Sequence, residues 1–114
     1  MLSTKGFIPD AWAVTDLFGR IETMSPMTRD ILRTAHLGYG DNLVHFFSSY
    51  RKAVLFDMEV ALTGWPTKRT VELNRMSANP LSVCYQVSRR IDPEGVGLFW
   101  RLDVVLAQNH ARCA

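Results

Sequence analysis

The chain has 114 residues and a mass of 12.9 kDa, which is enough for one hydrophobic core and therefore one domain. Hydrophobic residues make up 47% and charged residues 21% of the sequence, a composition typical of folded globular proteins rather than disordered ones. The formal charge of +2, without a long run of Lys and Arg, argues against nucleic-acid binding, and no apolar segment is long enough to cross a bilayer.

The sequence predicts a cytoplasmic location. The N-terminus, MLSTKGFIPDAW, lacks the apolar core of a signal peptide. The two cysteines, Cys84 and Cys113, do not resemble a disulfide framework, so a reducing compartment is expected. No spacing of Cys and His residues suggests a zinc site, and no metal is expected.

The N-terminal part predicts a hairpin after a lead-in over residues 1–10. Short apolar runs at Ala11–Thr15 and at 20–24 flank residues 16–19, and Gly19 ends this turn as a tight turn requires. Ser25 can cap a helix over 26–34 that has Pro26 at its first position.

The longest predicted helix covers about residues 50–63, after a brief helical turn over 42–47. Ser48 or Ser49 can cap it, and Gly64 ends it. Apolar residues recur at spacings of three and four, and charged residues occupy much of the remaining surface. The apolar stripe contains Val54, Leu55, Met58, Ala61 and Leu62, and the polar remainder contains Arg51, Lys52, Asp57 and Glu59.

The C-terminal part predicts three antiparallel strands. Residues 69–76 alternate between polar and apolar, and residues 81–107 contain two apolar runs around the turn Asp92-Pro93-Glu94-Gly95. Both faces of the last strand carry large apolar groups, so it is expected inside a sheet that is covered on both sides. Residues 108–114 form a tail and a possible start of a linker helix. The expected fold is α+β, a five-stranded antiparallel sheet with short helices and one longer helix on one face.

The order of these elements resembles a PAS domain over residues 11–107. Ala13-Val14-Thr15-Asp16 through Ile21 is similar to the "vtD.dGrI" opening of that family, and residues 24–32 are similar to its "vN.a...ll" helix. Residues 99–104 are similar to its last strand with the "DiT" ending. Ser25 stands where the family usually has Asn. The chain has no match to the GxNCRFLQ motif of the flavin-binding subgroup and no His in residues 50–63, so flavin and haem are disfavoured.

The resemblance implies a sensory module of bacterial-style signal transduction, associated with transcription regulators or histidine kinases and without chemistry of its own. Occupancy of a pocket shifts the packing of helices and strands, and the shift passes to an effector domain or partner, which can lie beyond Ala114. By similarity to flavin-binding relatives, Arg101 corresponds to an inward-facing polar residue that contacts the ligand. Its guanidinium suits a carboxylate or phosphate, and the alternatives are an ion pair with Asp103 or Glu72, or a solvated face.

A small-molecule pocket is expected between the long helix and the sheet, although a fully packed core is the alternative. Its candidate lining residues are Arg101, Tyr85, Val83, Val87, Phe99, Val54 and Met58. The other face of the sheet would leave apolar surface in water, which either a partner subunit or the N-terminal residues could cover. PAS domains commonly dimerise through this face, so the resemblance implies a homodimer. The candidate interface residues are Leu98, Trp100, Leu102, Val104, Phe7 and Trp12.

Two other functions stay open at this point. One is a purely structural dimerisation domain with a filled core. The other is a small α+β enzyme of the ketosteroid-isomerase kind, with Asp57, Asp103 or Glu72 as the base in an apolar pocket. The chain has no nucleophile elbow and no phosphate-binding glycine loop, so we expect no catalytic residues.

Overall fold

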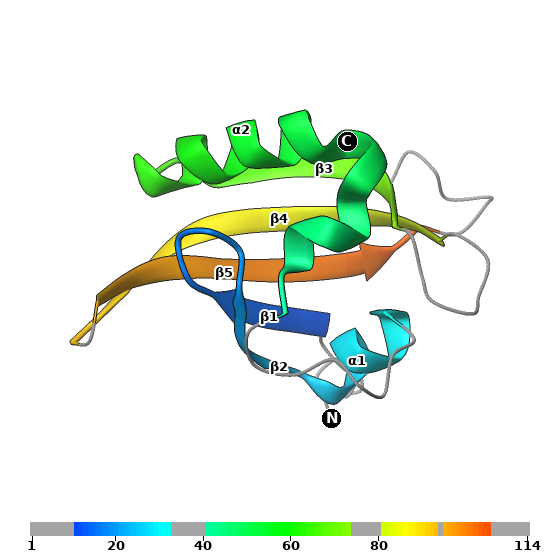
Figure 1. Ribbon diagram of the computed structural model, residues 1–114, viewed down its shortest axis with the longest axis horizontal. Helices are drawn as coiled ribbons and strands as arrows, with labels where there is room; N and C mark the ends of the chain where they lie inside the picture. Colours follow the sequence, from blue (N-terminus) through cyan, green and yellow to red (C-terminus); the bar gives the residue numbers. More distant parts are fainter. Residues whose placement is uncertain (1–10, 33–40, 74–80, 94, 106–114) are drawn as a thin grey trace, which may run out of the picture.

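The computed structural model describes residues 11–32, 41–73, 81–93 and 95–105. Its five strands form one antiparallel sheet in the order β2-β1-β5-β4-β3, and the helices lie over one face of that sheet (Figure 1). The elements are β1 (Ala11–Thr15), β2 (Ile21–Met24), α1 (Pro26–Leu32), the 3-10 helix η2 (Leu43–Tyr50), α2 (Arg51–Leu62), β3 (Thr67–Leu73), β4 (Leu81–Asp92) and β5 (Gly95–Val104). The predicted fold class is confirmed.

The turn between β1 and β2 is fixed by one carboxylate and one glycine. Asp16 Oδ1 accepts hydrogen bonds from the backbone N–H groups of Phe18 and Arg20, both at 2.9 Å. Partial burial acts to raise the pKa of the Asp16 carboxyl, but these bonds and the Arg20 side chain outweigh it and lower the pKa. Gly19 has a φ of 92°, a backbone conformation that other residues rarely adopt.

Ser25 caps α1 as predicted. Its Oγ accepts a hydrogen bond from the Thr28 N–H at 3.3 Å and another from the Trp12 N–H at 3.1 Å. The Thr28 hydroxyl donates to the Trp12 carbonyl at 2.7 Å, so the cap also joins α1 to β1.

The predicted cap of the longest helix is wrong. Neither Ser48 nor Ser49 begins α2, because η2 runs directly into it and Tyr50 is the N-cap residue without a side-chain cap. The predicted end is confirmed, since Gly64 follows the helix with a φ of 105°.

The buried face of α2 differs from the predicted stripe at two positions. Val54, Met58 and Ala61 are buried as expected, but Leu55 is exposed and Asp57 is buried. Asp57 lies three residues after Val54 and four before Ala61, so it shares their face in a helix of 3.6 residues per turn. The position of each residue around the helix, and not its polarity, determines that Asp57 is buried and Leu55 is exposed.

The predicted faces of β5 are reversed. Leu98, Trp100 and Leu102 were expected on the outer face, yet all three are buried in the core. Trp100 and Leu102 lie opposite Val87 and Tyr85 of β4, so they share the face that the helices cover. Alternation determines which residues lie together, but both faces of β5 are apolar, and the pattern alone did not tell which face is covered.

The remaining residues of β5 follow from this reversal. Phe99 and Arg101 lie on the opposite face of the sheet, which we call the open face because no helix within the described residues covers it. On this face the Phe99 ring stacks with Trp12 at a centroid distance of 6.4 Å. Val104 shares the parity of the core residues but is 40% exposed near the end of the strand. Phe7, the other interface candidate, lies outside the described residues.

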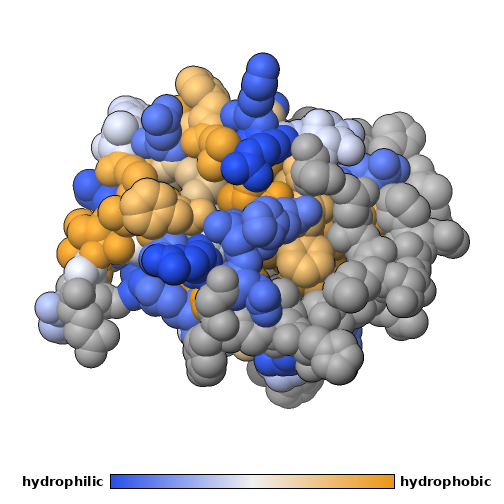
Figure 2. Space-filling view, in the orientation of Figure 1, coloured by the Kyte–Doolittle hydropathy of each residue, from blue (hydrophilic) through white to orange (hydrophobic). Residues whose placement is uncertain are grey.

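The surface over the helices mixes charged and apolar side chains (Figure 2). Apolar side chains gather toward the end where β4 and β5 join, and the exposed apolar residues include Ile91 and Val96, which face each other across that hairpin. No helix in the described part of the chain is long and apolar enough to cross a membrane.

Cys84 on β4 is disulfide-bonded, whereas the sequence predicted no disulfide framework. The other cysteine of the chain, Cys113, lies outside the described residues. The cysteines therefore give no support to the prediction of a reducing compartment.

Candidate functional site

Five of the predicted pocket residues do gather between the long helix and the sheet. Val54 and Met58 come from the inner face of α2, and Val83, Tyr85 and Val87 come from the facing side of β4. All five are buried. Phe99 and Arg101 do not join them, because they lie on the other face of the sheet.

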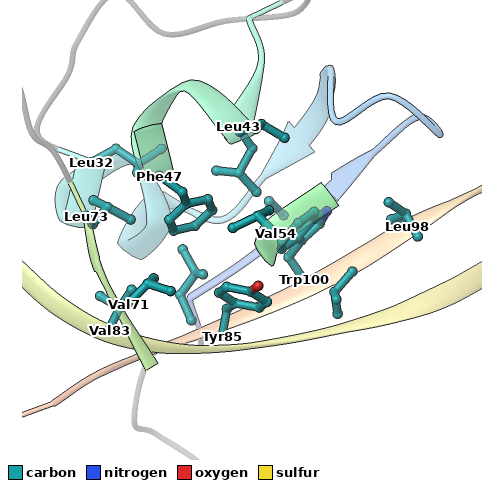
Figure 3. Close-up of a cluster of buried hydrophobic side chains, with 14 of the residues drawn as sticks. Leu32, Leu43, Phe47, Val54, Val71, Leu73, Val83, Tyr85, Leu98 and Trp100 are labelled. Carbon is teal, nitrogen blue, oxygen red and sulfur yellow. The ribbon is translucent and has the colours of Figure 1, made fainter. Parts of the chain in front are cut away.

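Three aromatic rings fill the interior beside these residues (Figure 3). The ring of Tyr85 lies 5.4 Å from that of Phe47 and 5.4 Å from that of Trp100, and the Phe47 and Trp100 rings are 6.2 Å apart. The Trp100 Nε1–H group donates to the Thr15 hydroxyl at 3.0 Å, so its one polar atom is satisfied. The centre of the domain is thus a packed aromatic cluster.

A polar cluster lies next to the rings, where α2 meets β3 and β4. Arg69 Nε donates to Asp57 Oδ2 at 2.7 Å, and Arg69 Nη2 donates to Asp57 Oδ1 at 3.0 Å, which is a bidentate ion pair. The Tyr85 hydroxyl donates a short hydrogen bond to Asp57 Oδ2. We call Asp57, Arg69 and Tyr85 the interlayer cluster, because it joins a helix of one layer to two strands of the other.

The three residues of the interlayer cluster differ in how far their side chains are buried. The side chains of Asp57 and Tyr85 are buried, but that of Arg69 is 37% exposed. The hydrogen bond to Asp57 is the largest influence on Arg69 and raises the pKa of its guanidinium, so Arg69 stays charged. Burial, followed by the bond to Asp57, raises the pKa of the Tyr85 phenol above its ordinary value. One end of the cluster reaches solvent, and the other lies in the core.

The raised pKa of Tyr85 predicts a loss of stability in alkali. Above about pH 10 an unfolded tyrosine loses its proton while the folded Tyr85 keeps it, so the unfolded state binds fewer protons and is favoured as the pH rises. We expect the free energy of unfolding of the wild type to fall more steeply above this pH than that of Tyr85→Phe. Urea unfolding at a series of alkaline pH values measures both, and parallel curves would contradict the placement of the phenol.

Sequence reasoning missed Arg69, and it named Asp57 only as a candidate base of the enzyme alternative, without connecting it to Tyr85. Asp57 was assigned to the polar face, although its spacing from Val54 and Ala61 placed it on the apolar stripe. Arg69 lies directly opposite Tyr85 in the register of β3 and β4. That register could have been found by pairing the predicted strands, because a residue opposite Tyr85 shares its face.

Neither a protein-family model nor a curated protein matches this chain. Solved structures do. A PAS domain of an HTR-like protein from Haloarcula marismortui superposes with a TM-score of 0.73 at 15% identity, covering 87% of this chain and 89% of that one. The chain has the PAS fold.

Two further solved structures are similar to this chain in fold. The PAS-B domain of Drosophila melanogaster Cycle carrying W398A, with bound glycerol, has a TM-score of 0.72 at 6% identity, covering 82% of this chain and 98% of that one. The Vibrio cholerae VqmA dimer has a TM-score of 0.71 at 12% identity and covers 95% of this chain. The chain spans 55% of that VqmA chain, about half its length.

Proposed function

We propose that this protein is a PAS-type sensory module in signal transduction and that a small molecule bearing a carboxylate sets its state. The observation that carries the proposal is the interlayer cluster: a bidentate arginine and a buried tyrosine hydroxyl converge on one carboxylate between α2 and the sheet. A few convergent polar groups beside apolar and aromatic side chains are typical of small-molecule sites. In the present structure the carboxylate of Asp57 takes the position that the ligand would take.

The mechanism is an exchange of carboxylates. A ligand that reaches the exposed end of Arg69 competes with Asp57 for the guanidinium and for the Tyr85 hydroxyl. Once displaced, Asp57 no longer holds α2 to β3 and β4, and the helix shifts relative to the sheet. The ligand stabilises the shifted state because it binds that state more tightly than the state seen here. The shift is the signal passed to an effector domain or partner.

Native mass spectrometry with acetate, succinate and benzoate as probes tests this proposal. We expect at least one probe to bind the wild type with one molecule per chain. Tyr85→Phe keeps the ring and removes one donor, so it should weaken binding about tenfold. Arg101→Gln, a matched loss of charge on the open face, should leave binding unchanged. Absence of binding by all three probes, or equal binding to wild type and Tyr85→Phe, would overturn the proposal.

A purely structural dimerisation module is the second candidate, and the packed cluster of Phe47, Tyr85 and Trp100 favours it. It predicts self-association without binding of any probe. Both candidates are homodimers, and neither is an enzyme. The carboxylate of Asp57 already accepts hydrogen bonds at both oxygens, and Asp103 and Glu72 are exposed, so none of the three resembles a general base in an apolar pocket. We propose a cytoplasmic location, as the sequence predicts, although the disulfide at Cys84 does not support it.

A further inference from the structure

One edge of the sheet is open within the described residues. β3 pairs with β4 over all of its residues, Thr67–Leu73, and with no other described strand. Figure 1 shows β3 at the margin of the sheet, with α2 running along it. An edge strand presents unpaired backbone N–H and C=O groups, which can pair with a strand of another chain.

Two exposed residues of opposite charge lie at equal distances from Thr70 in β3. Lys68 and Glu72 stand two residues to either side of it, both are exposed, and neither forms an ion pair within the described part of the chain. At roughly 3.3 Å per residue they are about 13 Å apart, too far to pair with each other. Charges on an edge strand often prevent self-pairing, because like charges meet. Here an antiparallel copy would bring opposite charges together.

We propose that β3 pairs with β3 of a second copy of this chain, antiparallel and centred on Thr70. The inference rests on the homodimer of the proposed function and names its interface. In this register Lys68 lies opposite Glu72 of the partner subunit, and the two-fold axis repeats the contact. The two sheets become one continuous sheet, and opposite-charge pairs directly across the strands stabilise the pairing.

The flank of α2 above β3 fits the same arrangement. Asp57 points from α2 toward Arg69 of β3, and Phe56 and Val60 lie next to Asp57 around the helix, on the side away from the core. Phe56 is 60% exposed. Antiparallel edge pairing makes the two-fold axis perpendicular to the sheet, so both α2 helices lie on the same face with these flanks turned toward each other. Dimerisation then removes apolar surface of Phe56 from water.

A charge exchange tests the register. Lys68→Glu alone places two glutamates opposite each other at both ends of the pairing, and Glu72→Lys alone places two lysines there. Each variant should dimerise about tenfold more weakly than the wild type at low salt. An equimolar mixture of the two variants restores opposite charges at both contacts, so mixed dimers should form with about wild-type affinity. Native mass spectrometry with one variant isotope-labelled separates mixed from like dimers.

Arg51→Glu, the same charge reversal on the side of α2 turned away from Phe56, is the control and should dimerise like the wild type. A wild type that stays monomeric would overturn the inference together with the proposed homodimer. A dimer that forms equally well in all variants, without preference for mixed pairs, would overturn the β3 interface alone. Neither result bears on probe binding at Tyr85, so failure of this inference and failure of the sensory proposal remain distinguishable.

Discussion

Asp57→Ala should destabilise the protein by about 3 kcal/mol. The substitution leaves the buried Tyr85 hydroxyl without its acceptor and leaves the Arg69 guanidinium without its partner. A fully buried pair would cost more, but part of Arg69 reaches water, and its hydration offsets some of the loss. Urea unfolding measures the difference as a lower midpoint with an unchanged slope.

Two variants calibrate the expected loss at Asp57. Tyr85→Phe removes one donor from the same carboxylate and should cost about 1 kcal/mol. Glu59→Ala removes an exposed carboxylate from the same helix and should change stability by no more than about 0.5 kcal/mol. If Asp57→Ala were as mild as Glu59→Ala, the interlayer cluster would not hold α2 to the sheet, and the carboxylate exchange would lose its basis.

Trp100→Ala should cost about 3–5 kcal/mol, because it opens a cavity in the middle of the core. The ring packs between Phe47 and Tyr85, and its Nε1–H group donates to Thr15, so both packing and a buried hydrogen bond are lost. Phe99→Ala, one residue earlier on the open face, should cost only about 1–2 kcal/mol. Thermal or urea unfolding of the two variants compares the two faces of β5 directly.

Which of the two substitutions lowers the free energy of unfolding more tests which face of β5 is covered. A larger loss for Phe99→Ala than for Trp100→Ala would support the original sequence interpretation and contradict the structure. If Trp100→Ala does not fold, Trp100→Phe keeps a ring at the site and should still lose stability in the same direction.

The fold could be predicted from the sequence because its local signals agree with one another. Ser25 and Gly64 mark the start of one helix and the end of another, and the turn around Gly19 separates two short strands. These features depend on a few neighbouring residues, so one sequence suffices to read them. Their order along the chain was enough for the resemblance to a PAS domain, which the structural similarities confirm at the level of fold.

The candidate site could be predicted only in part, because it depends on contacts between distant residues. Tyr85 and its apolar neighbours follow from alternation along one strand. Arg69 enters through the register of two strands, and Asp57 enters through the orientation of a helix whose weakly amphipathic pattern left two positions ambiguous. Arg101 was chosen through the resemblance to flavin-binding relatives. Its expected inward orientation was wrong, because both sides of β5 carry large apolar groups and only the packed structure decides which side is covered.

The central claim is that carboxylate-bearing molecules act at the interlayer cluster. Amide NMR spectra of the full chain, titrated with acetate, succinate and benzoate at millimolar concentration, test it most directly. We predict saturable shifts that are centred on Asp57, Arg69 and Tyr85, spread along α2, and are weakened in Tyr85→Phe. The contradicting result is the absence of saturable shifts at these residues with all three acids, or shifts confined to the open face around Arg101.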